Sequence, residues 1–153
     1  MQSVPFAEID GFALGQHAGP YPTWPLRTPL LKGGVPTGKN VRGYHLTFQF
    51  RLARDEYLLI LDWDCPFEEY YEVYLLSETG AVLSHLTTPP MNPLSVGGAP
   101  TLLCSWQVVN EHKLRLLSCD APPHLDITVR ERRPWRFGSR LAAVWDDTLD
   151  RNR

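Results

Sequence analysis

The chain has 153 residues, of which 43% are apolar and 11% aromatic, and its formal net charge is −2. This composition is typical of a folded globular protein and argues against a disordered chain, and the length predicts a single domain over residues 1–153. No apolar run approaches the roughly 20 residues that a membrane-spanning helix needs, so we expect no membrane partner.

Residues 1–40 are rich in residues that interrupt regular structure. They hold six of the fourteen prolines and six glycines. Proline fixes φ and removes a hydrogen-bond donor, which predicts an irregular arm and leaves open only a short strand or edge pairing. The arm also contains Phe12, Tyr21 and Trp24. Large aromatic side chains are stabilising when they are buried, so we expect the arm to pack on the domain and not to extend as a free tail.

Residues 41–133 show the period of two that is typical of strands. Leu46, Phe48, Phe50 and Leu52 alternate with polar residues, which predicts a strand with one wet face. Residues 57–63 are apolar on both sides, which predicts a central strand covered on both faces. The seven predicted strands are 44–52, 57–63, 70–76, 81–87, 101–109, 114–119 and 125–131. Together they indicate a mostly all-β fold, a single antiparallel sandwich or open barrel of about seven strands.

The C-terminal segment suggests one exception to the β pattern. Leu141, Val144, Trp145 and Leu149 recur at helical spacing after Ser139, a residue type that caps helices. We therefore predict a short helix over residues 138–150.

The three cysteines, Cys65, Cys104 and Cys119, form no CxxC pair. They are most simply read as free thiols in a reducing cytosol, and a Cys104–Cys119 disulfide would instead need an oxidising compartment. The N-terminus has neither a basic start nor an apolar stretch, so no signal peptide is visible and a cytoplasmic location is expected.

The charge is distributed unevenly along the chain. No Lys or Arg lies between Arg54 and Lys113, a stretch that holds nine carboxylates. Residues 1–54 carry a formal charge of +4 and residues 113–153 carry +3. A surface of one sign steers and selects partners of the opposite sign, so this acidic middle third is the strongest functional signal in the sequence.

The acidic stretch from Asp62 to Tyr74 is the candidate site. In the strand at 70–76, Tyr71, Val73 and Leu75 are expected to face the core, which would leave a Tyr-Glu-Tyr stripe outward beside the Asp62 and Asp64 edge. Tyrosines supply contact area, and carboxylates pair with a partner's basic residues. The expected partner-binding residues are Asp62, Asp64, Glu68, Glu69, Tyr70, Glu72 and Tyr74.

Other chemistries are less well supported. The acidic cluster also suits a Ca²⁺ or Mg²⁺ site or a glycosidase pair, but its spacing is not that of an EF-hand. The segment Gly33 to Asn40 imitates a phosphate-binding loop without the final Ser or Thr and without a strand-to-helix context. The arginines of residues 130–140 are expected to pair with the acidic segment and not to bind nucleic acid. No nucleophile motif is present, so we expect no catalytic residue and no cofactor.

These features favour a non-catalytic protein that binds another protein with a basic surface. Intracellular inhibitors such as bacterial immunity proteins fit this physics, because an acidic surface can neutralise a toxin whose active cleft is basic. The alternatives are a β-barrel or sandwich that holds a small apolar ligand, and a structural assembly subunit.

Overall fold

The computed structural model describes residues 5–64, 70–89, 102–119, 123–132 and 138–146. Within these residues the chain forms twelve strands in three antiparallel sheets, with no α-helix. The strands are β1 Phe6–Glu8, β2 Phe12–Leu14, β3 Thr28–Lys32, β4 Val35–Val41, β5 His45–Leu52, β6 Tyr57–Asp62, β7 Glu72–Leu76, β8 Val82–Thr87, β9 Leu103–Asn110, β10 Lys113–Ser118, β11 His124–Val129 and β12 Leu141–Asp146. Two short 3-10 helices are η1 Tyr21–Thr23 and η2 Ala53–Asp55. None of the described helices is long and apolar enough to cross a membrane.

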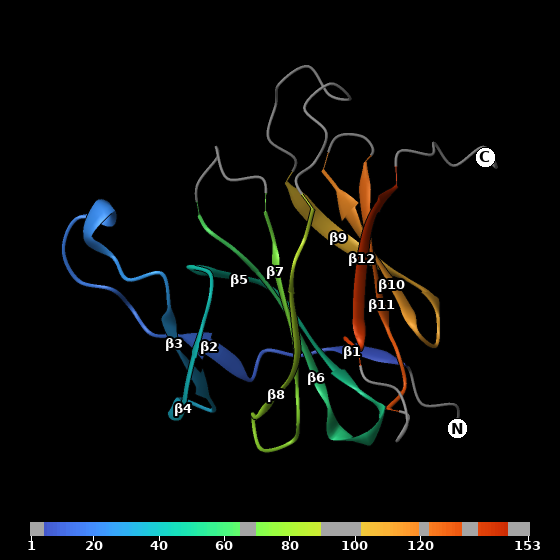
Figure 1. The fold of residues 1–153 in the computed structure, drawn as a ribbon, viewed down its shortest axis with the longest axis horizontal. Helices are drawn as coiled ribbons and strands as arrows, with labels where there is room; N and C mark the ends of the chain where they lie inside the picture. Colours follow the sequence, from blue (N-terminus) through green and yellow to red (C-terminus); the bar gives the residue numbers. More distant parts are fainter. Residues whose placement is uncertain (1–4, 65–69, 90–101, 120–122, 133–137, 147–153) are drawn as a thin grey trace.

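The three sheets lie side by side as layers (Figure 1). The middle sheet has the order β1-β5-β6-β7-β8, one outer sheet has the order β12-β11-β10-β9, and the small outer sheet has the order β2-β3-β4. The prediction of a mostly all-β protein is confirmed, and each of the seven predicted segments contains a strand. The prediction of a single sandwich or barrel of about seven strands is wrong, because β1–β4 and β12 add five more strands and a third sheet.

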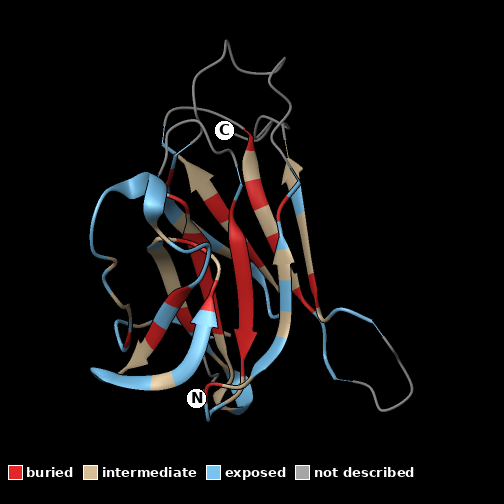
Figure 2. Cartoon of the chain, turned by 60° about the vertical axis from the view of Figure 1, so that its left-hand side comes forward, coloured by how far each residue is buried: buried red, intermediate tan, exposed pale blue. Residues whose placement is uncertain are grey.

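The middle sheet is buried on both faces, and its central strand β6 explains why. Leu58 and Ile60 point into a core shared with the four-stranded sheet, whereas Leu59 and Leu61 point into a core shared with the small sheet. All four side chains are fully buried. The apolar run of residues 57–61 is therefore the consequence of two covered faces, as predicted. Figure 2 shows the buried residues along the middle strands and the largely exposed outer strand β4.

A bulge in β5 lets one strand serve both cores. The pairing of β5 with β6 shifts register between Leu46 and Phe48. Leu46 consequently packs on the core of the small sheet, whereas Phe48 and Phe50 pack on the larger core. A bulge re-aims the following side chains in this way. The expected wet face is covered in part, because the Gln49 side chain bonds the backbone N–H and C=O of Phe12 in β2 at 2.8 and 3.1 Å, whereas Arg51 stays exposed.

The Pro/Gly-rich arm is more regular than its composition indicates. β1 adds to the edge of the middle sheet, and β2, β3 and β4 form the small sheet. The β3–β4 turn is Gly33-Gly34, with φ of 59° and 79°. A two-residue hairpin turn of type I′ requires positive φ at both positions, which glycine supplies. The apparent phosphate-binding loop is thus part of a β-hairpin, and no helix follows it.

The segment predicted as a helix over residues 138–150 is a strand where it is described, and residues 147–150 lie outside the described residues. β12 pairs with β11, so that Leu141, Ala143 and Trp145 face the core and Val144 is 62% exposed. The helix prediction is wrong because a short apolar run fits both periods. The backbone N–H and C=O groups at the edge of β11 need hydrogen-bond partners, and β12 supplies them along the whole strand. This pairing favours a strand over a helix.

Cys104 on β9 and Cys119 after β10 are joined by a disulfide, with their Cα atoms 5.0 Å apart. This separation lies within the usual range for bonded cysteines. The prediction of free thiols is therefore wrong for these two residues, and the alternative pairing is the one observed. Cys65 lies outside the described residues.

Candidate functional site

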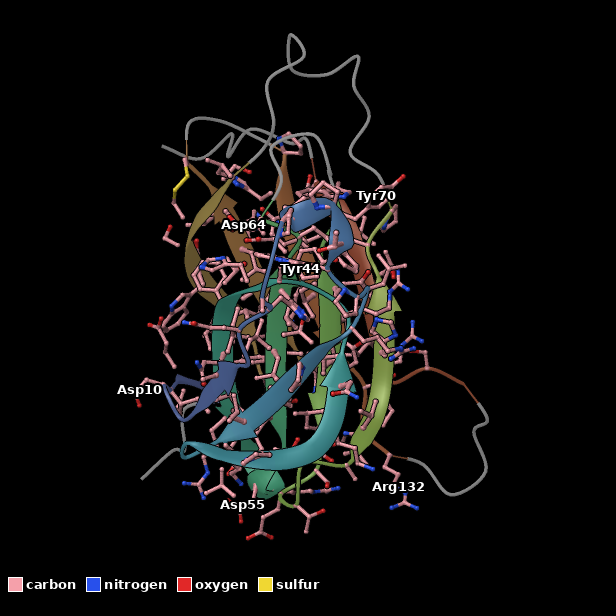
Figure 3. All side chains as sticks on the ribbon, turned by 90° about the vertical axis from the view of Figure 1, so that its left-hand side faces the viewer. Asp10, Tyr44, Asp55, Asp64, Tyr70 and Arg132 are labelled. Atoms are coloured by element: carbon pink, nitrogen blue, oxygen red, sulfur yellow. A yellow bond between two sulfur atoms is a disulfide. The ribbon has the colours of Figure 1, made fainter. Side chains whose placement is uncertain are left out.

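The acidic middle third does not gather into one ridge. Asp55 pairs with Arg51, and Glu56 accepts two hydrogen bonds from Arg140 at 2.7 and 2.9 Å. Figure 3 places Asp55 at one end of the molecule and Asp64 toward the other. The prediction of a continuous acidic surface is therefore wrong for the described residues. Arg51 lies only four residues before Asp55, and Arg140 belongs to the C-terminal arginines that were expected to pair with the acidic segment, so that expectation is met at Glu56.

Asp62 and Asp64 differ in environment although they are two residues apart. Asp62 accepts hydrogen bonds from the Thr47 hydroxyl and from the backbone N–H of Asp64, both at 2.8 Å, and lies 3.0 Å from His45 Nδ1. Asp64 follows the end of β6 in a left-handed conformation with φ of 51°, and it is exposed. Within the described residues, only Asp64 of this pair presents an uncommitted carboxylate.

Glu68 and Glu69 lie outside the described residues. The described residues contain no group of three His, Cys, Asp or Glu side chains placed to hold a metal ion.

The outward Tyr-Glu-Tyr stripe exists only in part. Tyr70 is 41% exposed, but Glu72 and Tyr74 are buried. Tyr71, Val73 and Leu75 do face the larger core, as predicted. The prediction that Glu72 and Tyr74 face solvent is wrong because the small sheet, which was not predicted, covers that side of β7.

Glu72 is instead the centre of a buried polar network. One carboxylate oxygen accepts a hydrogen bond from Arg42 Nε at 3.3 Å, and the other lies 2.7 Å from both His85 Nε2 and the Thr87 hydroxyl. Burial by itself raises the pKa of Glu72, but the hydrogen bonds from His85, Thr87 and Arg42 and the charge of His85 outweigh it, so the pKa is lowered. Glu72 therefore stays ionised and anchors Arg42.

The backbone around Arg42 is also fixed. Tyr74 accepts a hydrogen bond from the Arg42 backbone N–H at 2.9 Å, and Thr28 donates to the Gly43 carbonyl at 2.7 Å. Gly43 has φ of 115°, and a Cβ there would lie 2.8 Å from Leu61 Cβ. Only glycine fits this position without strain. The turn that carries Arg42 is therefore held by contacts on every side.

An aromatic cluster lies next to this network, with Tyr44 at its centre. The ring centroid of Tyr44 lies 5.1 Å from Trp63, 5.3 Å from Trp24, 5.5 Å from His17 and 5.6 Å from Tyr21. All four contacts are close to perpendicular, the edge-to-face arrangement that aromatic pairs prefer. The cluster holds the loop that contains η1 against the end of β6.

Together the aromatic cluster and the Glu72 network form a cleft of about 570 Å³. This volume is within the usual range for ligand sites. Its walls include Tyr21, Trp24, Arg42, Tyr44, Trp63 and Tyr70. Figure 3 shows Tyr70 and Asp64 on the face that also carries Tyr44. Of the predicted site residues, Tyr70 and Glu72 line this cleft, and Asp64 directly follows the lining residue Trp63.

Some hydrogen-bonding groups in the lining of the cleft have partners, and others have none among the described residues. The Tyr44 hydroxyl donates to the Pro25 carbonyl at 2.9 Å. Arg42 is held through Nε and lies 5.3 Å from the Trp63 ring centroid. Its two terminal nitrogens make no hydrogen bond to a described residue, and the side chain is 38% exposed. The cleft therefore presents an anchored guanidinium whose outer donors are available.

A second cleft of about 640 Å³ lies around Glu56 and Arg140. Its lining mixes acidic and basic residues, and the ion pair between Glu56 and Arg140 already satisfies its most buried charges. This cleft is therefore the weaker candidate.

Comparison with protein-family models, with curated proteins and with solved structures found no match for the chain. The function is consequently inferred from its own geometry. Sequence reasoning missed His17, Tyr44 and Arg42. Its only signal for the aromatic cluster was the aromatic content of the arm, where Tyr21 and Trp24 stand among prolines.

Proposed function

We propose that this chain is a non-catalytic protein that binds another protein, and that the aromatic cleft beside Asp64 is its contact site. The observation that carries the proposal is an aromatic cleft lined by an anchored Arg42, whose two terminal nitrogens make no hydrogen bond to a described residue. Tyr, Trp and Arg are the side chains that contribute most to binding at protein interfaces. Because the rings are already packed against one another, binding orders few side chains, which lowers its entropic cost.

The electrostatic part of the proposal is narrower than a continuous acidic ridge. Asp64 is the described carboxylate available beside the cleft, and it favours a partner with a basic group near the contact. An inhibitor or immunity protein that neutralises a toxin remains one class of protein with this activity. The Cys104–Cys119 disulfide favours an oxidising compartment over the cytoplasm as the place where it acts.

The test is affinity capture from the cells that produce the chain, under oxidising conditions, followed by calorimetry with the recovered partner. Leu26 lines the cleft and is 64% exposed, so Leu26→Ser should keep the fold and weaken binding at least about tenfold. Val35→Ser is the matched control, because Val35 is 65% exposed on β4 and does not line the cleft. Equal affinity of both variants for the partner would contradict the proposed site.

A further inference from the structure

We infer that the aromatic cleft recognises an extended, proline-rich segment with a basic residue beside it. This inference rests on the proposed function and names the chemistry of the segment that the partner inserts. It follows from the shape and packing of the aromatic walls, from the hydrogen-bonding groups that the cleft offers, and from the charge around it.

The aromatic walls suit a proline-rich segment in the polyproline II conformation. Such a segment is already extended before binding, so little conformational entropy is lost, and its pyrrolidine rings pack against aromatic side chains. In the cleft, Tyr21, Trp24 and Tyr44 are locked in mutual ring contacts of 5.2 to 5.6 Å. A rigid aromatic wall therefore faces a ligand that is itself rigid.

The hydrogen-bonding groups select the same kind of ligand. Arg42 offers donors, and the Tyr70 hydroxyl makes no hydrogen bond to a described residue. The one carboxylate in the described lining, Glu72, is 1% exposed and its two oxygens are taken by Arg42, His85 and Thr87. A proline-rich segment presents carbonyl acceptors and few N–H donors, which matches this set. A saccharide presents vicinal hydroxyls that also need acceptors, which the described carboxylate does not supply.

The charges argue for a basic residue and against an anionic ligand. Arg42 and Glu72 are the only charged side chains in the described lining, and they neutralise each other. Asp64 directly follows the lining residue Trp63 and is exposed, so a negative side chain lies at that end of the cleft, whereas the exposed Arg27 follows the lining residue Leu26. A free carboxylate ligand is repelled near Asp64, whereas an Arg or Lys flanking the proline-rich segment is attracted.

The test uses two capped synthetic peptides, Arg-Pro-Leu-Pro-Pro-Leu-Pro and the same peptide with Gly in place of every Pro. Binding is followed by calorimetry and by the fluorescence of the chain's own tryptophans, since the peptides contain none. We expect the Pro peptide to bind with a dissociation constant below about 1 mM and at least about tenfold more tightly than the Gly peptide.

Variants connect the binding to the cleft. Tyr70→Ser and Arg42→Lys should each lower the affinity for the Pro peptide by about tenfold. Tyr70→Ser removes an exposed ring with its hydroxyl, and Arg42→Lys removes the planar guanidinium while keeping the charge. Asp64→Asn should weaken binding in 50 mM salt and much less in 500 mM salt, where surface charges are screened. Val35→Ser is the control and should bind as the native chain does.

Equal affinity for the Pro and Gly peptides would overturn the inference, as would Pro-peptide binding that Tyr70→Ser leaves unchanged. Binding of a neutral oligosaccharide such as cellohexaose, with no response to the Pro peptide, would also overturn it. Failure of the Pro peptide alone, with a captured partner still weakened by Leu26→Ser and Tyr70→Ser, would refute the ligand class and leave the proposed function standing. A captured partner that ignores both variants would refute the proposed function as well.

Discussion

Replacing Glu72 with Gln tests the buried network that holds Arg42. The glutamine keeps the size of the side chain but turns one acceptor oxygen into an NH₂ group that faces the donors His85 and Thr87. Hydrogen bonds to charged groups contribute about 1.5–3 kcal/mol each, and breaking a buried ion pair costs about 3–5 kcal/mol. Because Arg42 and His85 are 38% and 30% exposed, water replaces part of the loss. We expect Glu72→Gln to lower the free energy of unfolding by about 3 kcal/mol.

The assay is urea unfolding at a series of pH values, together with thermal unfolding near neutral pH. A loss of this size corresponds to a fall in Tm of roughly 6–12 °C for a chain of this length. The pKa of Glu72 is lowered in the folded protein, so the unfolded chain takes up the proton first as the pH falls. The stabilisation is therefore full above the ordinary pKa of about 4.3 and is lost as the pH falls from there through the folded pKa.

The difference in free energy of unfolding between the native chain and Glu72→Gln should consequently be largest near neutral pH and become smaller below about pH 4. Glu78→Gln is the matched control, because Glu78 is exposed in the β7–β8 turn. Surface substitutions of this kind change stability by less than about 0.5 kcal/mol. If the two variants were equally stable at neutral pH, or if the Glu72→Gln difference persisted unchanged at pH 3, the account of Glu72 as a buried ionised anchor would be refuted.

Four further predictions concern the fold. Reducing the Cys104–Cys119 disulfide, which closes a sequence separation of 15 residues, should lower the free energy of unfolding by about 3 kcal/mol, and coincident urea midpoints with and without reductant would contradict this. Phe50→Ala should cost about 3–5 kcal/mol in the same assay because Phe50 is fully buried, and a near-native midpoint would contradict its placement in the larger core. Val144→Glu should change stability by less than about 0.5 kcal/mol, whereas Ala143→Glu should cost several kcal/mol, because in β12 the side chain of Val144 is exposed and that of Ala143 packs on the core. If this segment were a helix with Val144 on its apolar face, Val144→Glu would be the more destabilising change. Gly43→Ala should be destabilising by more than about 1 kcal/mol and should weaken Pro-peptide binding by displacing Arg42; native stability in thermal unfolding would show that the turn tolerates a Cβ.

The strands that the sequence predicted well are those whose neighbours along the chain are also their partners in a sheet. The β7–β8 and β9–β10 hairpins have local pairing, and the Ser77 to Gly80 turn closes with a hydrogen bond from the Gly80 N–H to the Ser77 carbonyl. The small sheet was missed because its strands contain Pro29 and Pro36. Proline cannot donate a backbone hydrogen bond to a neighbouring strand, so its presence argues against a strand prediction. Its stability comes from packing on Leu59, Leu61 and Tyr74, which local patterns do not report.

The candidate site was harder to predict than the fold, since the cleft joins residues from several separate parts of the chain. Tyr21 and Trp24 come from the arm, Arg42 and Tyr44 flank Gly43, and Trp63 follows β6. No spacing rule connects these positions, because each is brought to the cleft by a different sheet contact. The acidic stretch included Asp64 and Tyr70, which lie at the proposed cleft, but it overestimated the extent of the acidic surface, because a charge count takes no account of the burial of Glu72 or of ion pairs such as Arg51–Asp55.

The small sheet explains why the fold and the candidate site depend on each other. By covering one face of β7 it buries Glu72, and a buried carboxylate needs strong partners, which Arg42, His85 and Thr87 provide. Arg42 is thereby fixed through Nε in the lining of the cleft, and its terminal nitrogens make no hydrogen bond to a described residue. The loop between β2 and β3 then places Tyr21 and Trp24 in the lining of the same cleft. Detaching the small sheet would therefore expose Glu72 and dismantle the aromatic wall in the same step, so binding and the stability of this layer should be lost together.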